Sequence, residues 1–236
     1  MTYKINEILI ATTNPGKITE IQSCFGNSIK LLNLKDFVPI KEVEEDGETF
    51  EENARKKAIG YSLSTGKLTI ADDSGLVIDA LNGDPGVKSA RFSCEKLKNE
   101  ERTLIDHRNI AKVLDLLKNV PLEKRTARFV CCMCLADSDN ILIEAKGTIE
   151  GLIIEEEIGT NGFGYDPIFF VPSLNKTVAQ MTQNEKNSIS HRGNAIRKMK
   201  EEMKNFIWIN GRGDNNNIDS KYSPIFIVIF ILLCSL

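Results

Sequence analysis

The chain has 236 residues, of which 27% are charged and 42% are hydrophobic, and its formal net charge is −3. This composition is typical of a water-soluble globular protein, and the length allows one large domain or two small ones. The negative net charge excludes a general basic surface for nucleic acid. The N-terminus leads directly into an apolar strand pattern without a signal-peptide core, so we expect a cytoplasmic protein.

The first predicted unit is the stretch EILIATTNPGK, an apolar strand followed by a turn and a helix. We expect Asn14 to cap this helix and Pro15 to occupy its first position. The turn is not a P-loop, because Ala11 stands in place of the first glycine and Ile18 in place of the hydroxyl residue. The free N–H groups of the first helical turn and Lys17 are nevertheless suited to an anion.

The next elements are a short strand near residues 30–34 and, after an acidic stretch, a helix. Thr49 and Glu52 have the spacing of a capping box. This pattern predicts a helix from about Phe50 to about Leu63.

The middle of the chain alternates extended and irregular segments. KLTIADDSGLVIDAL predicts a strand, a turn over residues 73–75 and a second extended piece. NGDPGVKSARFS is expected to be a loop because of its glycines and its Asp-Pro pair. A helical pattern over residues 110–117 stops before Pro121.

The last third of the body is rich in strands and ends in helices. Residues 126–158 contain two strand patterns around a Ser-Asp-Asn turn, and a glycine-rich loop, GTNGFGYDPIFF, follows. Thr182 and Glu185 form a second capping box, and a helix begins near Ser190. The alternation predicts a mixed α/β fold.

Three clustered cysteines allow two interpretations. Cys131, Cys132 and Cys134 could be metal ligands, but a structural zinc needs about four ligands. The histidines His107 and His191 are far away in sequence. We therefore favour a central strand that is buried on both faces, with cysteine acting as a small apolar residue.

The C-terminal tail differs from the body. We expect one domain over residues 1–209 and a tail over residues 210–236 that is polar and then apolar. The apolar run has 12 residues, which is short of the roughly 20 that a membrane helix needs. An extra strand or a segment without a folded role is favoured over a membrane anchor.

Four clusters of polar residues carry possible chemistry. Singly, each has an ordinary structural explanation, such as a solvated face, a turn or a packing aromatic. Together they combine carboxylates at a strand end, lysines beside a helix N-terminus, and aromatics on a glycine-rich loop, which suit Mg²⁺, a polyphosphate and a nucleobase. The clusters are Asn14 with Lys17, Glu44 with Glu45, residues 72–75, and residues 163–166 with Lys186, His191 and Arg192.

Six motifs give a specific resemblance. ATTNPGK, FEENARKKA, IADDSGL, GDPGVKSARFS, GTNGFGYDPIF and EKNSISHRGNA occur in this order between Ile8 and about Phe206. The chain thereby resembles the Ham1-type inosine triphosphate pyrophosphatases, which act on non-canonical purine nucleoside triphosphates. The resemblance implies an elongated α/β fold with a mixed central sheet, flanking helices and two lobes around a cleft, usually as a homodimer.

The resemblance also implies an activity and its residues. The activity is Mg²⁺-dependent hydrolysis of ITP, dITP and XTP to the monophosphate and pyrophosphate. The net charge argues against a nucleic-acid partner, and the short apolar run in the tail makes a membrane partner unlikely. Asp73 is implied as the catalytic residue and metal ligand, with Glu45 as the second carboxylate and the adjacent Glu44 left open. The implied substrate-binding residues are Thr12, Thr13, Asn14, Pro15, Gly16, Lys17, Asn53 and Lys57 for the triphosphate, Ser74, and then Phe163, Gly164, Tyr165, Asp166, Lys186, His191 and Arg192 for the base and sugar.

Selectivity is assigned to the last three of these residues. Lys186 and Arg192 are donor-only side chains, so a pocket built from them favours the 6-keto group of hypoxanthine and xanthine over adenine. Rejection of guanine is assigned to crowding at its 2-amino group by the loop at residues 163–166. Asn82 and Lys88 depart from the family pattern, which puts the contacts of their loop in question.

Three other functions compete with this hypothesis. A Maf-like nucleotide pyrophosphatase is disfavoured by SHRG together with FGYDP, and a non-catalytic nucleotide-binding module by Asp73 with an acidic partner near Glu45. A nucleic-acid-binding protein is disfavoured by the net charge.

Adjacent strand residues point to opposite faces, so Asp72 and Asp73 cannot both serve equally as metal ligands. We choose Asp73, and we expect Asp72→Asn to cost less activity than Asp73→Asn.

Overall fold

The computed structural model describes residues 7–25, 29–37, 39–93 and 101–211. These residues form a seven-stranded sheet in the order β2-β1-β3-β4-β5-β6-β7. β1 runs parallel to both β2 and β3, and the remaining neighbours are antiparallel, so the predicted mixed sheet is confirmed. The strands are β1 (Glu7–Ile10), β2 (Lys30–Asn33), β3 (Thr69–Ile78), β4 (Thr126–Asp137), β5 (Asn140–Ile153), β6 (Phe169–Val171) and β7 (Lys176–Thr177).

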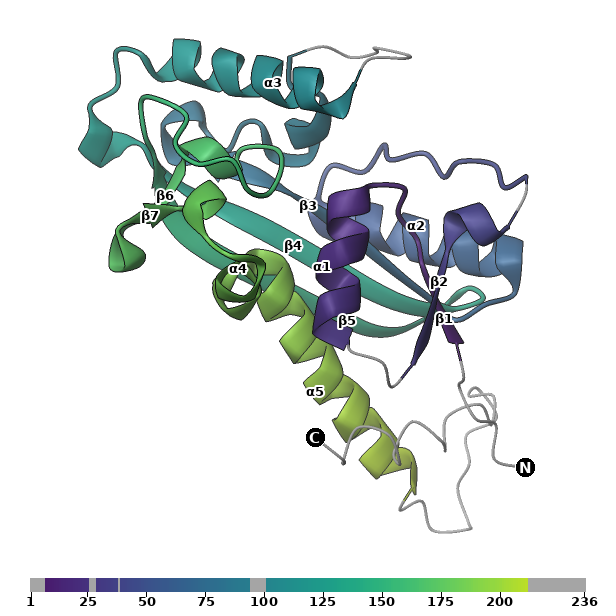
Figure 1. Ribbon diagram of the computed structural model, residues 1–236. Coiled ribbons are helices and arrows are strands. Elements are labelled where there is room, and N and C mark those ends of the chain that lie inside the picture. Colours follow the sequence, from purple (N-terminus) through teal and green to yellow (C-terminus); the bar gives the residue numbers. More distant parts are fainter. Residues whose placement is uncertain (1–6, 26–28, 38, 94–100, 212–236) are drawn as a thin grey trace.

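Helices cover both faces of this sheet (Figure 1). They are α1 (Pro15–Phe25), α2 (Phe50–Thr65), α3 (Arg102–Leu117), α4 (Gln183–Ile189) and α5 (His191–Gly211). On one face Cys131 and Met133 of β4 pack in a core with α1 and α5. On the other face Cys132 and Cys134 pack in a core with α2. The prediction of a central strand buried on both faces is therefore confirmed.

A third core gives the molecule its second lobe. It joins Leu76 and Ile78 at the end of β3 to Ile110 and Val113 of α3 and to Phe169 of β6. In Figure 1, α3, β6 and β7 gather at one end of the long strands and α1 and α2 gather nearer the other end. The predicted elongated, two-lobed α/β fold is confirmed.

The predicted turn over residues 73–75 is wrong. β3 runs unbroken through this segment and pairs with β4 at Asp73↔Cys132 and Gly75↔Val130. A Cβ atom on Gly75 would lie 2.3 Å from the Ser89 hydroxyl oxygen. The glycine is therefore required for close approach of a neighbouring segment and does not mark a turn.

The segment from residue 82 to residue 93 was expected to be a loop, and part of it is helical. A 3₁₀ helix, η3, spans Gly86–Arg91. Asn82 has a φ of 53°, a left-handed conformation that asparagine tolerates better than most residues. Lys88 is exposed and does not line the pocket described below.

The predicted starts of four helices agree with the structure. Asn14 Oδ1 accepts a hydrogen bond from the backbone N–H of Gly16 (2.9 Å) at the start of α1. Thr49 caps α2, which ends two residues later than expected, and α4 begins with the predicted capping box at Thr182. The predicted helix near Ser190 is α5.

The predicted boundary at residue 209 falls inside α5, which continues to Gly211. The rest of the tail, and with it the choice among its interpretations, lies outside the described residues. Within the described ranges, none of the helices has both the length and the apolar character needed to span a membrane.

Candidate active site

A pocket of about 610 Å³ lies beside β3, where this strand loses its neighbour. β1 pairs with β3 only at Leu9↔Thr69 and Ile10↔Ile70. Both faces of β3 therefore reach the pocket, next to the carboxyl end of β1, a position where open α/β sheets bind ligands. The predicted site residues that line it are Thr12, Thr13, Asn14, Lys17, Glu45, Lys57, Asp73, Ser74, Phe163, Gly164, Tyr165, Asp166, Lys186, His191 and Arg192.

The segment that joins β1 to α1 brings the start of a helix to this pocket. Thr12 Oγ1 accepts from the Asn14 backbone N–H (3.2 Å), and Asn14 Oδ1 accepts from the N–H groups of Gly16 and Lys17 (2.9 and 3.4 Å). The asparagine side chain therefore orders the first turn of α1, where the helix dipole favours an anion. Pro15 and Gly16 belong to this turn but do not line the pocket.

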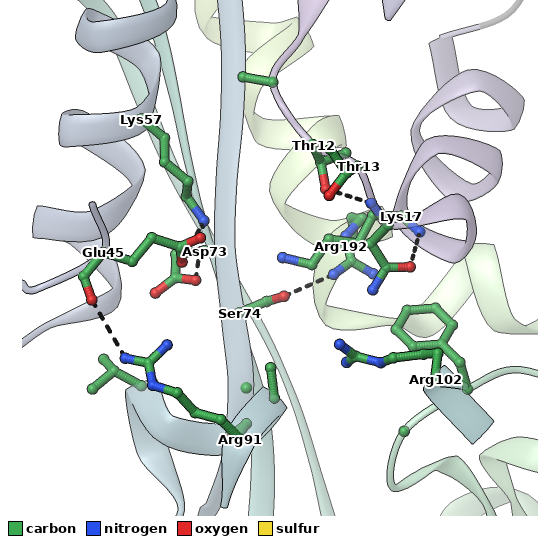
Figure 2. A pocket seen from close by; sticks show the side chains of 18 of the residues that line it. Thr12, Thr13, Lys17, Glu45, Lys57, Asp73, Ser74, Arg91, Arg102 and Arg192 are labelled. Atoms are coloured by element: carbon green, nitrogen blue, oxygen red, sulfur yellow. Dashed lines mark hydrogen bonds and ion pairs between the residues drawn. The ribbon is translucent and has the colours of Figure 1, made fainter. Parts of the chain in front are cut away.

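A carboxylate pair lies on the α2 side of β3 (Figure 2). The Lys57 ammonium lies 3.0 Å from Glu45 Oε2 and 3.3 Å from Asp73 Oδ1. Asn53 does not line the pocket but donates to Asp73 Oδ2 (3.1 Å) and so orients this carboxylate. Glu44 is exposed and does not line the pocket, so the structure places Glu45 at the site.

The pKa values of Asp73 and Lys57 are both shifted by their surroundings. Burial and the nearby Glu45 carboxylate raise the pKa of Asp73, although Lys57 and Lys17 oppose the change. Burial alone would lower the pKa of Lys57, but Asp73 and Glu45 raise it above its ordinary value. Lys57 is therefore a permanent cation between two carboxylates.

The opposite side of β3 carries Asp72 in a different environment. This aspartate is fully buried and its Oδ2 lies 3.0 Å from Lys17 Nζ and 3.1 Å from Arg192 Nη2. These cations hold its pKa far below the usual range in spite of burial. Arg192 Nη2 also donates to Ser74 Oγ (2.8 Å). The predicted alternation of Asp72 and Asp73 across the strand is confirmed by their separate partners, Lys17 and Arg192 for Asp72 and Lys57 for Asp73.

A buried acid that the sequence interpretation missed completes this network. Glu20 of α1 accepts from Arg192 through a very short contact, and Lys186 Nζ lies 2.7 Å from its other oxygen. Its pKa is lowered to about 2, because Arg192 and Lys186 outweigh the effect of burial. Glu20 lies three residues after Lys17, on the inner side of α1. An acidic residue among apolar ones on that side was the only available signal.

The glycine-rich loop contributes the opposite end of the pocket. Asp166 Oδ2 accepts from the Phe163 backbone N–H (3.0 Å) and from Lys186 Nζ (2.6 Å). Lys186 Nζ also lies 4.7 Å from the centre of the Phe163 ring. Tyr165 lines the pocket but is mostly a core residue, and its hydroxyl donates to the Ser89 carbonyl oxygen (2.9 Å).

Gly16 has a steric role in this arrangement. A Cβ atom at Gly16 would lie 2.5 Å from Cδ1 of Phe163. The aromatic ring therefore rests against the backbone of the first turn of α1, and the two loops of the pocket are in direct contact.

His191 stacks on Phe129 with ring centres 4.9 Å apart. Its Nδ1 atom is buried without a hydrogen-bond partner among the described residues. Burial and Arg192 lower the pKa of His191 well below its ordinary value. The imidazole is therefore neutral, and His191 lines the pocket while its unpaired Nδ1 atom is buried.

Several other lining residues lay outside the sequence prediction. Arg91 of η3 donates to the Glu45 carbonyl oxygen (3.3 Å), and Arg102 of α3 pairs with Asp106 (3.1 Å).

Within the described residues, no group of three or more His, Cys, Asp or Glu side chains is arranged to hold a metal. Any metal here would rely on the pair Glu45 and Asp73 together with ligand oxygens.

Comparisons with known proteins agree with this geometry. The sequence matches the Ham1 family over residues 8–202. It is 47% identical over 204 residues to a dITP/XTP pyrophosphatase of Shouchella clausii, covering 86% of this chain and 99% of that protein. It is 46% identical over 202 residues to a dITP/XTP pyrophosphatase of Bacillus cereus, covering 84% and 95%. The solved Ham1 protein of Staphylococcus aureus has a TM-score of 0.71 at 40% identity, covering 88% of this chain and 100% of that one.

Proposed function

Because the chain belongs to the Ham1 family, we propose that it is an enzyme that hydrolyses dITP, XTP and ITP to the monophosphate and pyrophosphate. One observation carries the proposal most directly. Glu45 and Asp73 converge on the Lys57 ammonium in a pocket that is also lined by Lys17 and by Phe163. Carboxylates, phosphate-binding cations and a base-stacking aromatic thus share one site.

The carboxylate pair suits a magnesium ion. Mg²⁺ is usually bound by one or two carboxylates plus substrate phosphates. Glu45 and Asp73 each have an oxygen within 3.3 Å of Lys57 Nζ, so the two carboxylates lie close together and an ion shared by them would bind beside this ammonium. The raised pKa of Asp73 indicates a carboxylate that an added divalent cation would stabilise. When bound, the ion supplies positive charge to the phosphate oxygens.

The chain's own residues account for the chemical step. Asp73 accepts a proton from water as the water oxygen bonds to the α-phosphorus. The bond between that phosphorus and the oxygen bridging to the β-phosphate breaks, and pyrophosphate leaves. Lys17, Lys57 and the N–H groups at the start of α1 balance the negative charge. Phe163 stacks on the base, and His191 and Lys186 line the base end of the pocket. The homodimer and the cytoplasmic location implied by the sequence remain part of this proposal.

The test is pyrophosphate release from dITP, XTP, ITP, GTP, ATP and dUTP, with and without Mg²⁺. We expect Mg²⁺-dependent release from the first three and much slower release from the others. Asp73→Asn should abolish release, whereas Asp79→Asn, an exposed control just after β3 that pairs with Arg128, should not. Preference for dUTP would favour a Maf-like enzyme, and tight binding of dITP without turnover would favour a non-catalytic module.

A further inference from the structure

The cations first assigned to base recognition already hold carboxylates. Lys186 Nζ lies 2.7 Å from Glu20 and 2.6 Å from Asp166. Arg192 uses its Nε, Nη1 and Nη2 atoms on Asp72 and Glu20. Both side chains are almost completely buried. Most of the donors of Lys186 and Arg192 are therefore already engaged by carboxylates of the protein. A further donor is needed to distinguish one 6-keto purine from another.

Arg102 is a cation with available donors at the same pocket. Its Nε donates to Asp106 Oδ1 (3.1 Å), and its Nη groups have no partner among the residues that the structure describes. The side chain is 47% exposed. Figure 2 shows its guanidinium pointing toward the interior of the pocket. Two pairs of N–H donors are thus free to contact a ligand.

Asp106 ties this arginine to the base-binding loop. Its second oxygen, Oδ2, accepts from the Gly164 backbone N–H (2.9 Å), and Asp106 itself is buried. Gly164 has a φ of 62°, in the left-handed region that favours glycine. One carboxylate therefore fixes both the loop beside Phe163 and the position of Arg102.

We propose that Arg102, held by Asp106, is a specificity-determining residue that donates to the oxygen at position 2 of xanthine. The inference rests on the proposed function. Xanthine carries oxygen at positions 2 and 6, hypoxanthine only at position 6, and guanine an amino group at position 2. A guanidinium has only donors, so it hydrogen-bonds to the oxygen at position 2 of xanthine and makes no hydrogen bond at position 2 of hypoxanthine. At position 2 of guanine it faces the amino group, another donor, which is unfavourable.

The placement of the helices supports this assignment. α3, which carries Arg102, lies across the glycine-rich loop from α4 and α5, which carry Lys186 and Arg192 (Figure 1). Positions 2 and 6 of a purine lie on either side of N1. Donors that approach from different sides of the loop can therefore contact one position each.

The decisive variant is Arg102→Gln, assayed by kcat/KM for XTP, dITP and GTP. Loss of a charge-assisted hydrogen bond should lower kcat/KM for XTP by about tenfold or more, mainly through KM. The value for dITP should change by less than about twofold, and that for GTP should not fall. Arg55→Gln is the matched control, because Arg55 is similarly exposed and pairs with Glu144 outside the pocket. It should leave all three values unchanged.

Variants of Asp106 test the positioning role. Asp106→Asn keeps an acceptor for the Gly164 N–H but loses the charge that holds Arg102. The value of kcat/KM should therefore fall more for XTP than for dITP. Asp106→Ala should raise KM for both substrates because the loop is released.

Other outcomes would overturn the inference. If Arg102→Gln lowers kcat/KM equally for XTP and dITP, the arginine contacts the sugar or the phosphates and not position 2 of the base. If XTP hydrolysis is unchanged, the arginine does not contact the ligand. A parent enzyme that releases no pyrophosphate from either substrate would instead refute the proposed function.

Discussion

Two adjacent aspartates on β3 should respond in opposite ways to the same substitution. Asp72 is fully buried between Lys17 and Arg192, and its pKa is far below the usual range. Asp73 faces Glu45 and Lys57, and its pKa is raised by burial and by the Glu45 carboxylate. Ionisation of Asp72 therefore stabilises the folded protein. Ionisation of Asp73 costs more free energy in the folded protein than in the unfolded chain, so it destabilises the fold.

The magnitudes follow from these environments. Breaking a buried ion pair by removing one partner costs about 3–5 kcal/mol. Asp72→Asn should lower the free energy of unfolding by about 3 kcal/mol. This value is at the lower end of the range because Arg192 still pairs with Glu20 and because Lys17 is partly exposed to water. Asp73→Asn removes a charge that the fold disfavours, so the free energy of unfolding should stay constant or increase.

The assay combines urea unfolding at neutral pH with pyrophosphate release from dITP. Asp72→Asn should lower the urea midpoint and reduce activity partially, while Asp73→Asn should keep the midpoint and lose turnover. The reasoning fails if Asp73→Asn loses as much stability as Asp72→Asn, or if it retains turnover close to that of the parent protein.

Acid stability and the contact between the two pocket loops give further predictions. The pKa of Glu20 falls from 4.5 to about 2, because Arg192 and Lys186 outweigh burial. Its stabilising contribution is therefore complete above about pH 4.5 and is lost as the pH falls toward 2. The thermal midpoint should decline over that range, and less steeply in Glu20→Gln; equal slopes would contradict the assignment. Gly16→Ala places a methyl group 2.5 Å from a Phe163 ring atom, so KM for dITP should rise with kcat little changed. Adding Phe163→Leu should recover part of the loss, and strict additivity of the two changes would exclude the contact.

The features that the sequence predicted well depend on neighbouring residues. A capping box needs only the spacing of Thr182 and Glu185, and the buried strand around Cys132 needs only a continuous apolar run. The motifs added the positions of the carboxylate and lysine groups, because Asp73 lies within IADDSGL and Lys57 within FEENARKKA. Local signals of this kind do not depend on which elements meet in space.

The features that the sequence missed depend on long-range contacts. Arg192 and Glu20 are 172 positions apart, and no periodic pattern links them. The error over residues 73–75 has the same origin, because Gly75 looks like a turn residue until Ser89 is placed against it. Arg102 was not predicted to line the pocket, because the contact that joins its partner Asp106 to Gly164 spans 58 positions in the sequence.

Backbone contacts at Ala11 explain how the proposed phosphate site forms without the first glycine of a P-loop. The Ala11 N–H donates to the Ile70 carbonyl oxygen (2.8 Å) as the last link to β3, and the Thr12 N–H then donates back to Ile10 (3.0 Å), which turns the chain away. The turn opens the edge of β3 and points the start of α1 at the opening. Lys17 forms its ion pair with Asp72 on one side of the strand (3.0 Å), whereas Asp73 on the other side forms its ion pair with Lys57 (3.3 Å). Strand alternation thus places the carboxylate that stabilises the folded site and the carboxylate proposed to act in hydrolysis on opposite sides of β3.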